Sequence, residues 1–286
     1  MDAHAPIGVF DSGIGGLSVA AAVAELLPRE DILYVSDNQR APYGPREAAE
    51  ILAYSEEITR FLLKCGAKMI VVACNTATSV AIDRLREEFP EVPFVGLEPA
   101  VKPAANGNVV GVLATEATLN SERYLALRDK HLSKKVVLEN PCRGLVSIIE
   151  AEQPGSNALR DKLRVIITPM ISLGLDTLVL GCTHYPMIKE DIQFIAGPDV
   201  RIIDPSPAAA KQVAHVLSAM RGGVDSPDSP QNPGTRDAPI TPVLSRGNLA
   251  HDFICTGNSV ALQRALLRLS SLNRRRRWVL PFGKIN

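Results

Sequence analysis

The sequence predicts an α/β protein made of two pseudo-symmetric, doubly wound domains with mainly parallel sheets. Three observations support this fold class. Short apolar runs alternate with longer amphipathic stretches, which is the pattern of successive βα units. Two strand-and-turn segments recur in the second half of the chain at nearly equal offsets. The length of 286 residues, with 46% hydrophobic residues, is enough to fill two cores.

The individual elements follow from the spacing of apolar residues. Expected strands are residues 7–10, 32–35, 69–73, 94–97, 109–113, 136–138, 178–180, 200–203 and a last strand and turn at 253–257. Expected helices are residues 17–27, 45–64, 159–173, 207–220 and 259–270. Within 45–64 the apolar side chains gather near one face, and Gly66 follows where a helix often ends.

Two segments of the first half are echoed in the second half. Residues 8–12 (GVFDS) resemble residues 111–115 (GVLAT), 103 positions later. Residues 71–76 (VVACNT) resemble residues 179–184 (VLGCTH), 108 positions later. Because the two offsets nearly agree, we expect a duplicated α/β unit.

Composition excludes several classes of partner. Lysine plus arginine and aspartate plus glutamate each total 31, so the net charge is zero and gives no general attraction to nucleic acid or anionic membranes. No apolar run approaches the ~18 residues that a spanning helix needs, and the N-terminus does not resemble a signal peptide. We therefore expect a cytoplasmic protein with neither nucleic acid nor membrane as partner.

Two segments near the C-terminus differ from the rest in composition. Residues 221–247 carry five prolines among Ser, Asp, Gly and Asn, which predicts a disordered loop or insert. The four consecutive arginines at 274–277 are expected to form a solvated tail or a helix end.

The five cysteines are scattered and form neither a C-x-x-C pair nor a zinc-binding pattern, so no metal site is expected. Cys74 and Cys182 each follow an apolar strand and precede polar side chains at the start of a helical segment. The carboxyl ends of parallel strands form the ligand crevice, and a helix N-terminus favours a thiolate. This pattern indicates two reactive thiols, whereas Cys65, Cys142 and Cys255 are expected to pack in the interior.

Three further segments carry candidate ligand groups. Residues 11–16 (DSGIGG) link the first strand to a helix, and their glycine spacing fits neither a dinucleotide fingerprint nor a phosphate loop. A carboxylate is the ligand that suits the free N–H groups there. Residues 41–45 (APYGP) form a rigid turn ahead of a helix. His184 lies two residues after Cys182, where it could orient a proton transfer.

Taken together, these segments resemble the glutamate racemase family. The matching pieces are IGVFDSGIGGLSV (7–19), APYGP (41–45), VVACNTATSVAI (71–82), LEPAVKPA (97–104), ATEAT (114–118) and LVLGCTHYP (178–186), with a weaker match at FICTGN (253–258). They occur in family order over roughly residues 7–220. The two cysteine segments are shared with the wider aspartate/glutamate racemase superfamily, while DSGIGG and PYG are typical of the glutamate branch.

The resemblance implies two domains with the active site between them, which we place at residues 1–98 with 209–286 and at residues 99–208. It implies that Cys74 takes the α-proton from D-glutamate and Cys182 takes it from L-glutamate. Asp11 is implied as helper to Cys74, His184 as helper to Cys182, and Glu150 as an assisting acid. The implied substrate contacts are Asp11, Ser12, Tyr43, Gly44, Asn75, Thr76, Thr183 and His184.

The resemblance further implies a homodimer that needs no cofactor and supplies D-glutamate for peptidoglycan synthesis. Two thiols suit such a reaction, because inversion of an α-carbon requires proton removal on one face and delivery on the other. A cysteine, with an ordinary pKa of ~8.5, can serve as either acid or base near neutral pH.

The sequence departs from the family pattern at Asn38, where threonine is usual, and at Arg143, where a proline usually follows Cys142 and which bears on Glu150. Three alternatives remain open. A related racemase would act on aspartate or a hydantoin-like substrate. A thiol-nucleophile enzyme would need one dominant cysteine, which the matching corners disfavour. A non-catalytic binding module is the third, including the gyrase-inhibiting role described for some family members.

Overall fold

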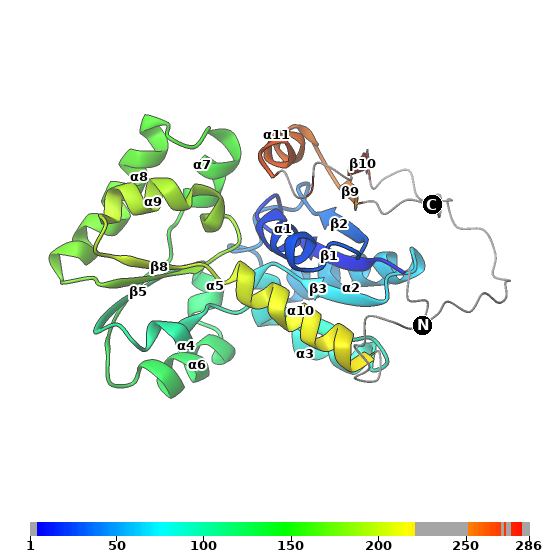
Figure 1. Cartoon of the computed structure of the whole chain (residues 1–286), viewed down its shortest axis with the longest axis horizontal. Coiled ribbons are helices and arrows are strands. Elements are labelled where there is room, and N and C mark those ends of the chain that lie inside the picture. Colours follow the sequence, from blue (N-terminus) through cyan, green and yellow to red (C-terminus); the bar gives the residue numbers. More distant parts are fainter. Residues whose placement is uncertain (1–4, 221–250, 270–271, 273–275, 282–286) are drawn as a thin grey trace, which may run out of the picture.

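Two parallel β-sheets, each with helices on both faces, lie side by side in the protein (Figure 1). The computed structural model describes residues 5–220, 251–269, 272 and 276–281. The predicted insert at 221–247 lies outside these residues. The α/β class and the parallel sheets are confirmed, since every strand pairing among the described residues is parallel.

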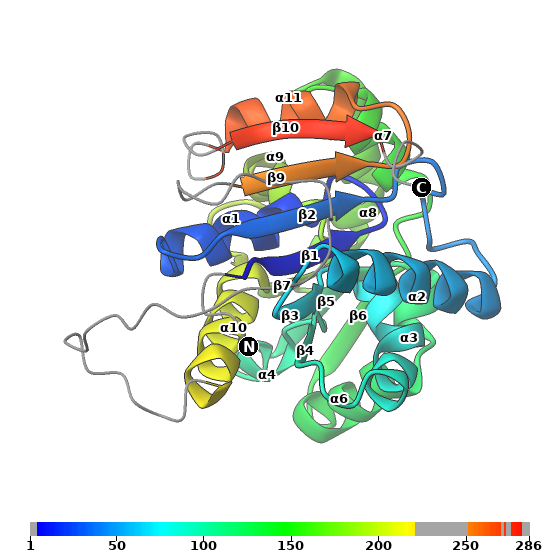
Figure 2. The same cartoon turned by 90° about the vertical axis from the view of Figure 1, so that its right-hand side faces the viewer.

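The first sheet has six strands in the order β10-β9-β2-β1-β3-β4, and Figure 2 shows them in this order. The second sheet has four strands in the order β6-β5-β7-β8. The strands are β1 (Ile7–Asp11), β2 (Ile32–Ser36), β3 (Met69–Val72), β4 (Phe94–Gly96), β5 (Val109–Ala114), β6 (Val136–Asn140), β7 (Thr177–Gly181), β8 (Arg201–Ile203), β9 (His251–Cys255) and β10 (Arg276–Pro281). All nine expected strands are present, with ends that differ by at most two residues.

The sheets share one topology. The order β2-β1-β3-β4 in the first sheet corresponds strand by strand to β6-β5-β7-β8 in the second. Each central strand pairs with the two strands that follow it in the same way, so the duplication predicted from the echoed segments is confirmed at the level of the fold. The predicted domain limits, after residues 98 and 208, stay a prediction.

The helices connect successive strands and cover both faces of each sheet. They are α1 (Leu17–Leu26), α2 (Ala48–Lys64), α3 (Asn75–Glu88), α4 (Val101–Ala104), α5 (Glu116–Leu119), α6 (Glu122–Leu132), α7 (Leu145–Ala151), α8 (Asn157–Ser172), α9 (Lys189–Ala196), α10 (Ser206–Met220), α11 (Val260–Arg268) and the 3₁₀-helix η1 (Tyr185–Ile188). The five expected helices are present. Helix α2 begins three residues late, because Glu47 and Glu50 form a capping box at its start. None of the described helices has the length and apolarity to cross a bilayer.

The interpretation of the arginine run was wrong for its second half. Arg276 and Arg277 begin strand β10, which pairs in parallel with β9 at the edge of the first sheet. Arg274 and Arg275 lie outside the described residues. A charged run can still form an edge strand, because the ladder is made by the backbone and one row of the strand's groups remains unpaired.

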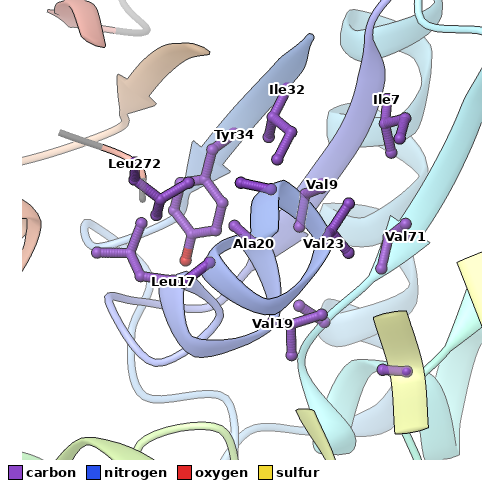
Figure 3. Close-up of a cluster of buried hydrophobic side chains, with 14 of the residues drawn as sticks. Ile7, Val9, Leu17, Val19, Ala20, Val23, Ile32, Tyr34, Val71 and Leu272 are labelled. Atoms are coloured by element: carbon purple, nitrogen blue, oxygen red, sulfur yellow. The ribbon is translucent and has the colours of Figure 1, made fainter. Parts of the chain in front are cut away.

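Alternating side chains of the strands build a core on each face of both sheets. In the first sheet, Ile7 and Val9 of β1 face α1 and α10, while Phe10 faces α2 and α3. Figure 3 shows Val9 and Tyr34 directed at Leu17 and Ala20 of α1. The second sheet packs α7, α8 and α9 on one face and α4 and α6 on the other. These layers fix the carboxyl ends of the strands, where the cysteine corners lie.

Candidate active site

Cys74 lies two residues after β3 and Cys182 lies directly after β7, and these are equivalent strands of the two sheets. Both thiols are buried. Cys74 caps helix α3: the Ala77 N–H donates to its sulfur at 3.4 Å, and its thiol donates to Ser12 Oγ at 3.7 Å. Burial raises the pKa of the Cys74 thiol to about 12, with further contributions from the negative charge of Asp11 and from the Cys182 sulfur across the site.

Asp11 joins the two halves of the molecule. It is fully buried at the end of β1, where its Oδ2 accepts the Gly13 N–H at 2.9 Å. Its Oδ1 accepts the Thr183 hydroxyl from the second sheet at 3.1 Å. Burial raises the pKa of Asp11, and the nearby His184 and the N–H donors oppose that rise. The carboxylate therefore lies between the two cysteine corners.

His184 connects Cys182 with Glu150. Its Nδ1 lies 3.9 Å from the Cys182 sulfur, and its Nε2 lies 2.9 Å from Glu150 Oε1. Burial lowers the pKa of His184, but Cys182, Glu150 and Asp11 outweigh that effect and hold it well above its ordinary value. Burial likewise raises the pKa of Glu150, yet its hydrogen bond to His184 and their mutual charge lower it overall. Cys182, Glu150 and Asp11 therefore favour the protonated imidazole beside the second thiol.

Arg143 does not disturb Glu150. The arginine side chain is exposed and forms a salt bridge with Glu116 at 2.8 Å. The residue that departs from the family pattern therefore lies on the surface. Glu150, on helix α7, still contacts His184.

Tyr43 and Gly44 lie in the turn that faces the second sheet. The Tyr43 hydroxyl donates to Asp37 Oδ2 at 2.5 Å, and the side chain is buried. A Cβ added at Gly44 would lie 3.3 Å from the Thr115 side chain, so this turn packs directly against the corner after β5. Because the phenol is committed to Asp37, a ligand would meet the backbone of this turn.

Asn75 and Thr76 form the first turn of α3. Asn75 Nδ2 donates one N–H to the Leu97 carbonyl at 3.2 Å, and its Oδ1 is buried without a hydrogen-bond partner in the described part of the chain. Asn75 therefore keeps one donor and one acceptor for a ligand. Thr76 Oγ1 lies 2.9 Å from Thr115 Oγ1, which joins the first corner to the second sheet.

Several residues at the site were missed by sequence reasoning. Thr115 bonds Thr76, and it holds the position equivalent to Ser12 in the echoed segments, which was a usable signal. Tyr34 and Ser36 both donate to the Gly13 carbonyl, at 2.8 and 2.6 Å, and so fix the DSGIGG turn. Asp37 accepts the Tyr43 hydroxyl and also, at 2.7 Å, the hydroxyl of Thr256, which lies 219 positions away and which no local pattern connects to it.

The remaining cysteines lie outside the two corners. Cys65 is partly exposed at the end of α2, and Cys255 is buried at the end of β9. Cys142 belongs to the core between the second sheet and α7–α9. Among the described residues, no group of three or more His, Cys, Asp or Glu side chains is arranged to hold a metal ion.

The duplicated fold, with one buried thiol at the matching corner of each half, has the architecture of an amino-acid racemase. Residues 7–213 match the family described as Asp/Glu/Hydantoin racemase. A glutamate racemase of Herpetosiphon aurantiacus is 47% identical over 217 residues, covering 75% of this chain and 85% of that protein. A glutamate racemase of Stutzerimonas stutzeri is 39% identical over 268 residues, covering 93% and 94%.

Solved structures agree with this assignment. A glutamate racemase of Bacillus anthracis superposes with a TM-score of 0.76 at 28% identity, over 97% of each chain. Escherichia coli glutamate racemase, in complex with L-glutamate and the activator UDP-MurNAc-Ala, gives 0.77 at 28% identity, over 97% of this chain and 98% of that one. The chain belongs to the Asp/Glu/Hydantoin racemase family.

Proposed function

We propose that the protein is a glutamate racemase, in which Cys74 and Cys182 act as opposing acid and base on the α-carbon. The observation that carries this proposal is the placement of the two thiols at equivalent corners of two sheets, linked by the Asp11–Thr183 hydrogen bond. The relatives named above are glutamate racemases, and one solved relative, from Francisella tularensis, is in complex with D-glutamate.

The proposed reaction needs one thiolate and one thiol at a time. From L-glutamate, the Cys182 thiolate takes the α-proton and the Cys74 thiol delivers its proton to the opposite face; from D-glutamate the roles reverse. The Ala77 N–H and the α3 N-terminus favour a thiolate at Cys74, against the effect of its burial. The ammonium group of bound substrate would offset the negative charge of Asp11, which otherwise raises the pKa of Cys74.

Asp11 and His184 are proposed as helpers of the two thiols. Asp11 contacts the first corner and is positioned to accept a substrate ammonium N–H. His184, held as a cation by Glu150, stabilises a thiolate at Cys182. Glu150 acts through His184, so it is a positioning residue.

The carboxylates of glutamate need hydrogen-bond donors at both ends of the molecule. Ser12, the backbone of Tyr43 and Gly44, Asn75, Thr76 and Thr183 are the groups proposed to supply them. Preorganised donors in a buried cleft stabilise the carbanion-like state that develops on the α-carbon. Selection of glutamate over aspartate would then rest on the distance between the two sets of donors, because the two substrates differ by one methylene group.

The proposal extends to the cellular role. D-Glutamate from this reaction would supply peptidoglycan synthesis, with the protein acting as a cytoplasmic homodimer on a small-molecule substrate. Neither nucleic acid nor membrane is proposed as a partner, in keeping with a net charge of zero. The reaction as proposed uses only groups of the chain and no cofactor.

The test is the decay of optical activity in purified protein given L-glutamate or L-aspartate, followed by circular dichroism. We expect racemisation of glutamate, and roughly a 10³-fold loss in Cys74→Ser and in Cys182→Ser, in both directions. Cys65→Ser is the matched control, because this partly exposed cysteine lies at the end of α2 away from the corners. Racemisation of aspartate alone, or near-normal turnover by either corner variant, contradicts the proposal.

A further inference from the structure

Two buried hydroxyl groups of strand β2 converge on one carbonyl oxygen of the DSGIGG turn. The Tyr34 hydroxyl donates to the Gly13 carbonyl at 2.8 Å, and the Ser36 hydroxyl donates to it at 2.6 Å. Both side chains are fully buried, and they lie on the same face of β2 because residues two apart in a strand point the same way. A carbonyl oxygen has two lone pairs and can accept both donors. The position of Gly13 is therefore set by two side chains of the first sheet.

The other groups of Gly13 contact the helpers of both thiols. Its N–H donates to Asp11 Oδ2 at 2.9 Å. A Cβ added at Gly13 would overlap Glu150 Oε1 and lie 3.3 Å from His184 Nε2. The glycine thus lies directly against the hydrogen bond between Glu150 and His184, whose side chains are 24% and 3% exposed. The turn therefore occupies space that water would otherwise take beside this bond.

The second half of the molecule carries a different side chain at the position equivalent to Tyr34. Tyr34 pairs with Val9 in the first sheet, and Val112, which is 103 positions after Val9, pairs with Glu139 in the second. Glu139 accepts the Tyr124 hydroxyl of α6 at 2.5 Å and so bonds within its own half. Anchoring of the turn by Tyr34 is thus a feature of the first half, whose turn approaches the cysteine corner of the other half.

Tyr34 is the constant donor of the pair. Ser36 Oγ also lies within hydrogen-bond distance of Asn38 Oδ1, which in turn accepts the Cys255 thiol at 3.2 Å. A serine hydroxyl has one hydrogen, so Ser36 shares it between two acceptors, whereas the Tyr34 hydroxyl has the Gly13 carbonyl as its single partner among the described residues. Burial raises the pKa of Tyr34 well above its ordinary value, so the phenol stays a donor at every working pH.

We propose that Tyr34 and Ser36 are positioning residues that hold Gly13 against the Glu150–His184 pair, so that water is kept from this bond and the protonated imidazole is favoured. This inference rests on the proposed function, in which that cation stabilises the second thiolate. Other charged or titratable groups also face the pair, and they are Cys182 and Asp11 beside the imidazole and Arg264 and Arg268 of α11 in the groove next to the carboxylate. The two hydroxyl groups on β2 carry no charge, so they act on the imidazole only through the position of the turn.

The test is an NMR titration of histidine-labelled protein, which measures the pKa of His184 directly once its signal is assigned by comparison with His184→Gln. That pKa stands well above its ordinary value, so water admitted to the bond moves it down toward that value. We expect a fall of about one unit when Tyr34→Phe and Ser36→Ala are combined. Each single variant should give a smaller fall, because one donor still holds the carbonyl. The matched control combines Tyr124→Phe with Ser55→Ala, which removes two buried hydroxyl groups that bond elsewhere.

A Glu150→Gln background separates positioning from loosened packing. Without the carboxylate there is no ion pair from which the turn excludes water, so loss of the two hydroxyl groups should leave the pKa of His184 where Glu150→Gln alone puts it. An equal fall in both backgrounds overturns the proposal, as does an unchanged or higher pKa when Tyr34→Phe and Ser36→Ala are combined.

If that double variant does not fold, Tyr34→Phe and Gly13→Ala decide. The Cβ added at Gly13 meets the end of the flexible Glu150 side chain and should lower the pKa of His184 by moving the carboxylate away. An unchanged pKa in either variant overturns the proposal. The titration needs no turnover, so a protein that shows these shifts without racemising glutamate contradicts only the proposed function.

Discussion

At the scale of single residues, the charge state of the second corner depends on the pair His184 and Glu150. The imidazole is buried, which by itself would favour the neutral ring, yet Cys182 at 3.9 Å, the Glu150 carboxylate at 2.9 Å and the charge of Asp11 together raise its pKa. Because the partner is a charge at hydrogen-bond distance, the raised pKa of His184 should be sensitive to removal of that charge alone. This isolates Glu150 as a determinant of the pH profile.

Glu150→Gln is expected to move the basic limb of kcat/KM for L-glutamate to lower pH, by about one unit. The imidazolium exists below the pKa of His184; without the carboxylate that pKa falls, so the cation is lost at a lower pH. The measurement is kcat/KM against pH. Glu152→Gln is the control, because Glu152 is exposed and is the C-cap residue of the same helix. A basic limb that stays in place would show that Glu150 does not control His184.

At the scale of elements, the turn between β1 and α1 is packed into the second cysteine corner. A Cβ added at Gly15 would lie 2.5 Å from His184 Nδ1 and 2.6 Å from Thr183 Oγ1. The glycine is required here by the close approach of the two halves. The turn therefore does more than connect a strand to a helix, because it sets how near the first sheet comes to His184.

Gly15→Ala is expected to reduce kcat/KM roughly tenfold or more, because displaced helper groups no longer align with the reacting carbon. Overpacking should also lower the free energy of unfolding by about 1–3 kcal/mol. Gly66→Ala is the matched control: its φ of +85° makes alanine cost about 1 kcal/mol, but no atom lies within 4 Å of the added Cβ. Kinetics and urea unfolding on both variants separate the effects, and a Gly15 variant with wild-type turnover would refute the role given to this turn.

The corners could be predicted from the sequence because strand ends and polar clusters are local patterns, and the two offsets are visible when the halves of the chain are compared. Tyr43 shows where such patterns fail, because the sequence does not reveal that its phenol donates to Asp37. The pairing of Glu150 with His184 spans 34 positions and depends on how α7 packs on its sheet, which no periodicity reports. Strand β10 was missed because consecutive arginines do not show the apolar pattern of a strand. The pairing of this edge strand is made by backbone groups.

At the scale of the whole molecule, side-chain hydrogen bonds connect the carboxyl ends of the two sheets. The Thr183 hydroxyl donates a hydrogen bond to Asp11, and the hydroxyls of Thr76 and Thr115 are hydrogen-bonded to each other. Each cysteine corner is therefore joined to the opposite half of the molecule. In an arrangement where each half carries one thiol, each thiol serves one face of a bound α-carbon. The consequence can be measured with isotopes, since in the proposed mechanism the two faces exchange protons with different sulfur atoms.

In deuterated water, the Cys74 thiol carries deuterium and Cys182 is the thiolate when L-glutamate binds. The Cys182 thiolate removes the α-protium and Cys74 delivers deuterium to the other face, so the first D-glutamate formed should be α-deuterated. Unconverted L-glutamate should stay protiated, because the proton held by Cys182 returns to the same face more readily than it exchanges in a closed cleft. Chiral chromatography with mass spectrometry at low conversion measures both labels. A single base acting on both faces would return protium to the product, and a carbanion open to solvent would deuterate both enantiomers equally; either result is incompatible with thiols on opposite sides of the carbon.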